Sequence, residues 1–165
     1  MPGDTIRYDI KEVGNTSTVP LTDFFWRDVL PVDAGRLNKI LTGTYNQSVK
    51  YKIIATTNKG DTIIIADNLS SVQNNAIDCR SAALGLRSDE FITSFTLVFG
   101  NVKAGFSQVE TPQVYVTLLK NLPNGYEFGN KVDVGDKYGA EWVIGNSTWV
   151  TTIYAQPTKL PRTGY

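Results

Sequence analysis

The segment Phe91-Ile92-Thr93-Ser94-Phe95-Thr96-Leu97-Val98-Phe99 decides the fold class of this chain. Its odd-numbered positions carry three phenylalanines and a leucine, whereas its even-numbered positions include a serine and a threonine. An alternation with a period of two residues is typical of a strand that buries one face. The pattern therefore predicts a β-strand whose odd-numbered side chains face the core.

Shorter segments with the same alternation lie on both sides of this strand. Tight turns are predicted at Asn58-Lys59-Gly60-Asp61 and at Pro123-Asn124-Gly125, because these residue types favour turn conformations. The alternation stops between Asp67 and Arg87, where we expect a long connection with helical turns at Asp67–Ser70 and Ala82–Leu84. The other strands are expected at Ile6–Lys11, Leu21–Val29, Leu37–Thr44, Val49–Ala55, Thr62–Ala66, Val114–Leu119, Lys131–Val134 and Thr148–Tyr154.

Short strands at intervals of roughly ten residues favour two packed antiparallel sheets over a parallel α/β fold. The chain has 165 residues, a length that fits one domain. We expect an all-β, immunoglobulin-like β-sandwich of about seven to nine strands. It should occupy residues 3–154, followed by a linker with a recognition motif in residues 155–165.

Composition excludes several classes of function. Sixteen basic and sixteen acidic residues cancel, and no basic run marks a nucleic-acid-binding face. The chain has no histidine, so catalytic triads and imidazole-ligated zinc sites are excluded. Its one cysteine, Cys79, cannot form an internal disulfide, and we expect a buried, unreactive thiol. We therefore predict a protein without catalytic residues, metal or cofactor, although chemistry by a pair of carboxylates remains open.

The C-terminal segment Leu160-Pro161-Arg162-Thr163-Gly164 resembles the Leu-Pro-x-Thr-Gly motif of sortase substrates. Pro161 favours an extended backbone, which suits binding in an enzyme groove. Thr163 supplies the carbonyl that a thiolate attacks, and Gly164 leaves that carbonyl unhindered. The resemblance implies a protein of Gram-positive bacteria that sortase joins to peptidoglycan or to a pilus subunit. The expected location is the extracellular surface, anchored to the cell wall.

The two ends of the chain lack other parts of a complete sorting system. Met1-Pro2-Gly3-Asp4 has neither the charged nor the apolar region of a signal peptide, and no apolar span follows Gly164. No apolar stretch is long enough for a membrane helix. We interpret the sequence as a segment of a longer secreted protein.

A second resemblance concerns the body of the chain. Its opening and its Gly129–Val134 segment are similar to the conserved-repeat domains of bacterial surface proteins, also called domain of unknown function 11. The similarity implies an immunoglobulin-like module of a stalk, adhesin or pilus. The matching segments of the opening are Pro2–Thr5, Tyr8, Gly14-Asn15, Val19–Thr22 and Asp28–Pro31.

Related pilin domains carry a Lys–Asn isopeptide bond between their first and last strands, and Asn130 stands where such an Asn would lie. The expected lysine before Gly3-Asp4 is missing, and Lys11 alternates with apolar Ile10, so its side chain should face solvent. We therefore predict no isopeptide bond. The usual role of Asn predicts that Asn130 caps or turns the chain.

Two tryptophans keep a carbohydrate-binding alternative open. Trp142 and Trp149 could stack on sugar rings if they are exposed, but core packing is the more common role of tryptophan. Asp133, Asp136 and Glu141 could in principle bind calcium, but their spacing matches no known loop, and we expect solvated turns. The sequence thus predicts a non-catalytic structural or adhesive module with a host or glycan ligand, and its alternative is a carbohydrate-binding sandwich.

Overall fold

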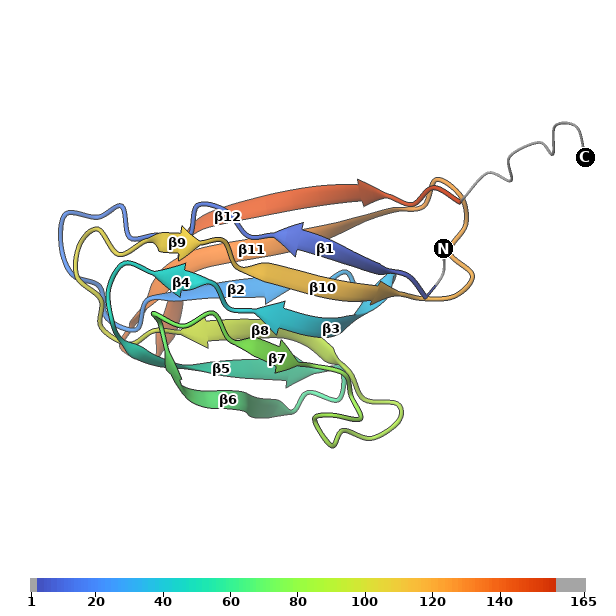
Figure 1. The fold of residues 1–165 in the computed structure, drawn as a ribbon, viewed down its shortest axis with the longest axis horizontal. Coiled ribbons are helices and arrows are strands. Elements are labelled where there is room, and N and C mark those ends of the chain that lie inside the picture. Colours follow the sequence, from blue (N-terminus) through green and yellow to red (C-terminus); the bar gives the residue numbers. More distant parts are fainter. Residues whose placement is uncertain (1–2, 157–165) are drawn as a thin grey trace, which may run out of the picture.

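The protein is a sandwich of two antiparallel β-sheets in the computed structural model, which describes residues 3–156 (Figure 1). One sheet has the order β1 (Thr5–Asp9), β10 (Gln113–Leu118), β3 (Gly35–Leu41) and β7 (Ala76–Asp78). The other has the order β12 (Glu141–Ile153), β11 (Glu127–Tyr138), β2 (Phe25–Val29), β8 (Ile92–Val98), β5 (Lys50–Thr57) and β6 (Thr62–Ser70). A small two-stranded sheet pairs β4 (Thr44–Tyr45) with β9 (Gln108–Glu110).

The all-β sandwich predicted from the sequence is confirmed, but residues 3–156 form 12 strands instead of seven to nine. Three of the additional strands, β4, β7 and β9, have only two or three residues each. A strand this short contains too few residues to show an alternation, so the period-two pattern cannot find it. Within the described residues 3–156, no helix has the length and apolarity needed to cross a membrane.

The predicted inward face is confirmed at Phe95 and Leu97 of β8 and at Phe99 directly after it, which are all buried in the core, whereas Phe91 and Thr93 are only half-buried. Thr96 and Val98, on the opposite phase of the alternation, are buried as well, and Ile92, on that same phase, is part of the core cluster. The cause at Ile92 is a register shift against β5, where Ser94 and Ile92 pair with consecutive residues and Thr93 is left as the extra residue of a bulge. A bulge changes which face the following side chains occupy.

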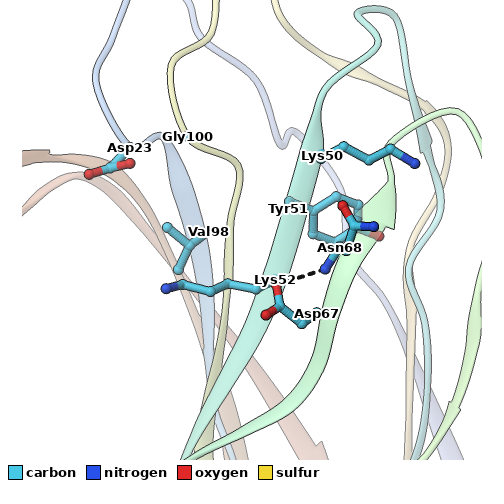
Figure 2. Close-up of a pocket in the computed structure, with 8 residues that line it drawn as sticks. All are labelled: Asp23, Lys50, Tyr51, Lys52, Asp67, Asn68, Val98 and Gly100. Carbon is cyan, nitrogen blue, oxygen red and sulfur yellow. Dashed lines mark hydrogen bonds between the residues drawn. The ribbon is translucent and has the colours of Figure 1, made fainter.

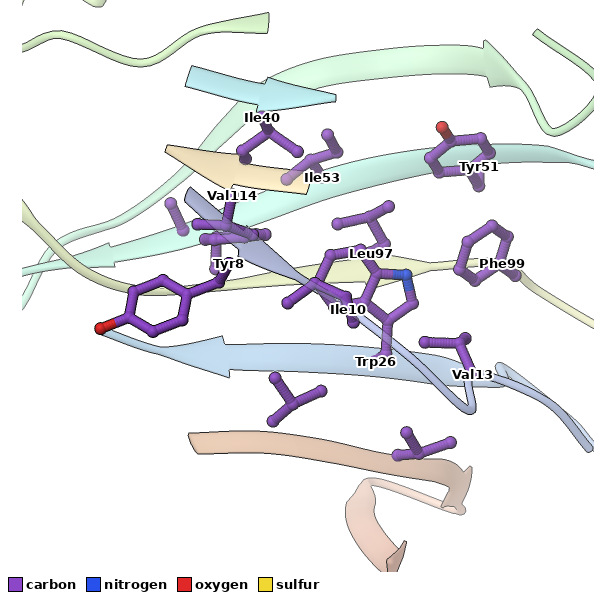
Figure 3. Packing of buried hydrophobic residues seen from close by; sticks show 14 of the residues in the cluster. Tyr8, Ile10, Val13, Trp26, Ile40, Tyr51, Ile53, Leu97, Phe99 and Val114 are labelled. Atoms are coloured by element: carbon purple, nitrogen blue, oxygen red, sulfur yellow. The ribbon is translucent and has the colours of Figure 1, made fainter. Parts of the chain in front are cut away.

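The core lies between the two sheets and is rich in aromatic side chains. Trp26 is fully buried and donates from Nε1 to the hydroxyl of Tyr45 at 3.0 Å, and this hydroxyl donates to the Thr42 carbonyl at 2.8 Å. Figure 3 shows Trp26 beside Leu97, with Tyr51 and Phe99 near one end of the cluster. The Tyr51 and Phe99 rings stack with their centroids 4.6 Å apart. Because each polar group in the series from Trp26 through Tyr45 to Thr42 has a hydrogen-bond partner, the series can be buried at little cost, and it fixes how the Trp26 and Tyr45 rings pack.

The segment between Asp67 and Arg87 differs in part from the prediction. Asp67–Ser70 does not cap a helix but completes β6, with a bulge at Asn68, whose φ is 53°. Ala82–Leu84 forms a hydrogen-bonded turn in which the Leu84 N–H donates to the Arg80 carbonyl at 3.1 Å. The two predicted tight turns are present, and Gly60 and Gly125 each adopt a φ of 83° in them.

The hairpin of β11 and β12 is much longer than predicted and forms one end of the large sheet. The two strands stay paired from Glu127↔Ile153 to Tyr138↔Glu141, and a bulge at Gly145 shifts their register. In Figure 1 this hairpin runs along the top of the molecule, and β12 is its outer strand. The residues singled out near the C-terminal end of the domain all lie on this hairpin.

Candidate functional site

The inner face of the β11–β12 hairpin carries a buried polar centre. Asp28 on β2 and Asn130 on β11 are 0% and 1% exposed, and the Asn130 Nδ2 donates to Asp28 Oδ2 at 2.8 Å. Burial raises the pKa of the Asp28 carboxyl to about 7, against the opposing effect of the hydrogen bond from Asn130. Within residues 3–156, Asp28 Oδ1 and Asn130 Oδ1 have no hydrogen-bond partner. This centre therefore holds a carboxyl group that is largely protonated below neutral pH.

The prediction that Asn130 caps or turns the chain is wrong, because the residue lies inside a regular strand. Asn130 lies two residues from both Phe128 and Val132, so the pleat places all three side chains on the core face, and the Asn130 amide lies beside Asp28. The period-two alternation of this segment was visible in the sequence. A polar residue such as Asn130 at a core-facing position interrupts that alternation, so the position was not recognised as buried. The buried partner on β2, more than 100 residues earlier, gave no local signal.

A groove of about 250 Å³ lies between β1 and the inner face of the hairpin, and Asn130 forms part of its wall. Tyr8 lines the same groove, and its hydroxyl lies 3.1 Å from Thr152 Oγ1, which ties the two sheet edges together. Burial raises the pKa of Tyr8, and the nearby Asp28 raises it further. Lys11 stands at the rim of the groove and is exposed, as predicted.

The outer face of the same hairpin carries Trp149, a residue that is 62% exposed. The core position predicted for Trp149 is therefore wrong. Its indole lies directly over Gly129, where a Cβ atom would overlap the ring, and Nε1 donates to Thr151 Oγ1 at 3.1 Å. The indole is thus held against the sheet by Gly129 and Thr151 while most of the residue is open to solvent, and an exposed, fixed aromatic ring is suited to stacking on a flat ligand.

Trp142 lies on the same outer face but is half-buried, so it is neither a core residue nor an open platform. Its ring meets the fully buried Phe25 edge-on at 5.0 Å. The Arg27 guanidinium lies 5.8 Å from the ring centroid and the Lys137 ammonium 5.0 Å from it. These cation–π contacts occupy the ring that a ligand would need. Of the two tryptophans, the structure exposes only Trp149 for stacking.

The three carboxylates considered for calcium do not come together. Asp133 is 1% exposed and is not in a solvated turn, which corrects the prediction. Its Oδ1 accepts from Ser147 Oγ at 2.6 Å, and its Oδ2 lies 3.7 Å from the Lys131 ammonium. Among the described residues, no group of three or more acidic, cysteine or histidine side chains could hold a metal ion. Cys79 is buried as expected, and burial raises the pKa of its thiol to about 12.

A separate pocket of about 220 Å³ lies beside β5 and β6, at the opposite side of the large sheet (Figure 2). Lys50 and Lys52 line it together with Asp67 and Asn68. The Asp67 carboxylate accepts from the Asn68 backbone N–H at 2.7 Å, so it stabilises the bulge of its own strand. The pocket is open and shallow, and we assign no ligand to it.

The residues of the sorting motif, Leu160, Pro161, Arg162, Thr163 and Gly164, lie outside the described residues. The described chain ends close to the domain body. Tyr154 is buried and its N–H donates to the Tyr126 carbonyl at 2.8 Å, and the exposed Gln156 donates its N–H to Asn124 Oδ1 at 2.9 Å. Three residues, 157–159, separate Gln156 from Leu160, the first residue of the motif.

Comparisons with known proteins give no family. No protein-family model matches the chain, and no curated protein matches it. A solved structure described as "AvmM Catalyzes Macrocyclization in Alchivemycin A Biosynthesis" superimposes with a TM-score of 0.40 and 10% identity, over 97% of this chain and 85% of that one. A likeness at this level carries no argument about fold or function.

Proposed function

We propose that this chain is a non-catalytic structural or adhesive module of a cell-wall-anchored surface protein. The observation that carries the proposal is the Leu160–Gly164 motif, which begins shortly after the last buried residue of the sandwich, Tyr154. In the sequence, residues 155–159 between Tyr154 and the motif contain no large apolar side chain, which is typical of a linker. Sortase and peptidoglycan or a pilus subunit are the partners that the proposal implies.

A transpeptidation assay tests the proposal. The chain is incubated with a sortase specific for Leu-Pro-x-Thr-Gly and an oligoglycine nucleophile. Mass spectrometry should show cleavage after Thr163 and attachment of the nucleophile there. Pro161→Ala should slow the reaction because it frees the backbone, whereas Arg162→Ala at the variable position should not. A chain that stays intact while a control peptide is consumed would remove the main support for wall anchoring.

The second candidate is a carbohydrate-binding sandwich, and the exposed Trp149 favours it. Binding to a glycan array should then be lost in Trp149→Ala and retained in Trp142→Ala, because of these two tryptophans only Trp149 is largely exposed. A wild-type chain that binds no glycan, or a loss caused by Trp142→Ala alone, would exclude this platform. The adhesive module remains our first proposal because it is the broader one. A glycan is only one of several kinds of ligand that an adhesive module can bind.

A further inference from the structure

The edges of the two main sheets differ in how well they are protected from pairing with another strand. An exposed edge presents unpaired N–H and C=O groups, and natural proteins usually shorten it, bend it or place charges along it. Strand β7 has three residues, and Asp78 at its end forms an ion pair of 2.6 Å with Arg80. Strand β1 has five residues and an exposed ion pair of 3.0 Å between Arg7 and Asp9. Both edges of the smaller sheet are thus short and charged.

In the part of the chain that the structure describes, the large sheet has one protected edge and one open edge. Strand β6 is interrupted by the Asn68 bulge, where the Asp67 carboxylate also faces the pocket of Figure 2. Strand β12, at the other end of the sheet, has 13 residues. After Glu141 it carries no charged residue from Trp142 to Ile153. Its bulge at Gly145 leaves the segment 146–153 in regular register with β11.

The apolar surface of the molecule is also concentrated on this strand. Of the ten large hydrophobic side chains that are exposed among the described residues, five belong to β12: Val143, Ile144, Trp149, Val150 and Ile153. They project from both faces of the strand, with Trp149 on the outer face and Val150 directly opposite Asn130 on the inner face. A long, uncharged and apolar edge is the kind that pairs with another chain.

We propose that β12 is an interaction edge that pairs antiparallel with β12 of a second copy of this chain. A two-fold axis perpendicular to the sheet joins the two large sheets into one continuous sheet and places the two Trp149 side chains on the same outer face. The second copy is the fitting partner because an uncharged strand meets itself without bringing like charges together. The interface is isologous, and the bulged β6 edge at the far side stops growth at the dimer.

Sedimentation velocity of the whole chain over a range of concentrations tests this proposal. The wild type should shift from monomer to dimer as its concentration rises. Thr148 is exposed on β12, and Thr148→Lys adds a positive charge to the shared edge of each copy, so association should weaken about tenfold or more. The matched control is Thr62→Lys, an exposed position on β6 at the opposite edge of the same sheet, which should dimerise like the wild type.

Circular dichroism of both variants shows whether they are folded, so that lost association is not confused with unfolding. A wild-type chain that remains monomeric at the highest concentration would overturn the proposal. A dimer that Thr148→Lys leaves intact, or that Thr62→Lys weakens equally, would place the interface elsewhere and overturn it too. Growth into species larger than a dimer would contradict the closed two-fold arrangement.

Discussion

Asp28 lies on the core face of β2 and is fully buried. Within the described residues, its carboxyl group has one hydrogen bond, which comes from Asn130. Its second oxygen and the Asn130 carbonyl oxygen are both without a partner there. If the carboxyl group is protonated, Asp28 Oδ1 can donate a hydrogen bond to Asn130 Oδ1. Together with the bond from the Asn130 amide, this closes a ring of two hydrogen bonds between acid and amide. An ionised carboxylate cannot do this and is costly to bury. The neutral form of Asp28 is therefore the one that suits the folded state.

The first prediction is that the protein loses stability as pH rises from about 4 to about 8. The pKa of Asp28 is about 7 in the folded protein against 3.8 for an ordinary aspartate, so between these values the folded state binds a proton that the unfolded state has released. The free energy of unfolding should fall by roughly 2–4 kcal/mol across this range. Denaturant titrations at several pH values measure it.

The Asp28→Asn variant provides the control, because its amide can make both hydrogen bonds with Asn130 at any pH. It should be more stable than the wild type above pH 8 and should show a much flatter profile between pH 5 and 8. Tyr8 faces Asp28 from β1, but its own pKa is raised from 10, so it stays neutral in this range. An unchanged slope in the variant would show that another group causes the pH dependence.

Predictions for single residues succeeded where a residue's local pattern determines its surroundings. Lys11 faces solvent and Cys79 is buried, as alternation and residue type indicated. Asn130 and Trp149 were assigned wrongly because distant or cross-strand partners decide their positions. The carboxyl of Asp28 stabilises the Asn130 amide in the core, and Gly129 makes room for the Trp149 ring on the surface. Pairings of this kind depend on strand register, which a single sequence does not reveal.

At the scale of the element, the β11–β12 hairpin depends on two glycines with different roles. Gly135 lies opposite Ile144, and a Cβ atom there would overlap the Val143 carbonyl oxygen and lie 2.9 Å from its carbon. Gly145 lies at the bulge in β12. A Cβ atom added there would lie 3.5 Å from the Val134 carbonyl oxygen, which is an ordinary van der Waals contact. Only the first position excludes a side chain by backbone contact.

The second prediction follows from this difference. Gly135→Ala should destabilise the protein by about 1–3 kcal/mol, because the β12 backbone must move away from β11. Gly145→Ala should change stability by less than about 1 kcal/mol. Thermal unfolding of the two variants beside the wild type compares them directly. Equal losses would mean that the bulge itself, and not the close approach at Gly135, limits this hairpin.

The long hairpin also shows where predictions of strand boundaries fail. Both strands were located, but only Lys131–Val134 and Thr148–Tyr154 were expected. The remaining parts contain glycines, asparagine and charged residues that interrupt the alternation, and they are strands because each has the other as a partner. The same reason explains Asp67–Ser70, where pairing with β5 overrides local capping residues. Strand propensity is determined largely by neighbouring strands.

At the scale of the whole molecule, the first and last thirds of the chain hold each other in place. Strand β1 pairs with β10 through Thr5↔Thr117, and β2 pairs with β11 through Val29↔Lys131. The two sheet edges are tied across the groove by the contact between the Tyr8 and Thr152 hydroxyl groups. All of these links are non-covalent. The all-β class could be predicted from the sequence, but this pairing order could not, because it joins residues far apart in the chain.

The third prediction is that no covalent bond joins these distant segments. A Lys–Asn isopeptide bond needs an amine beside the Asn130 amide, whereas on β1 the side chain that lines the groove with Asn130 and responds to the charge of Asp28 is the Tyr8 phenol. A phenol cannot form this amide bond. Lys11 lines the same groove, but its side chain is exposed at the rim and would have to be buried to reach Asn130. The intact mass should therefore equal that of the unmodified sequence. A mass lower by one ammonia, with Lys11 and Asn130 recovered in one cross-linked tryptic peptide, would show that the groove closes far enough to bring the amine to the amide.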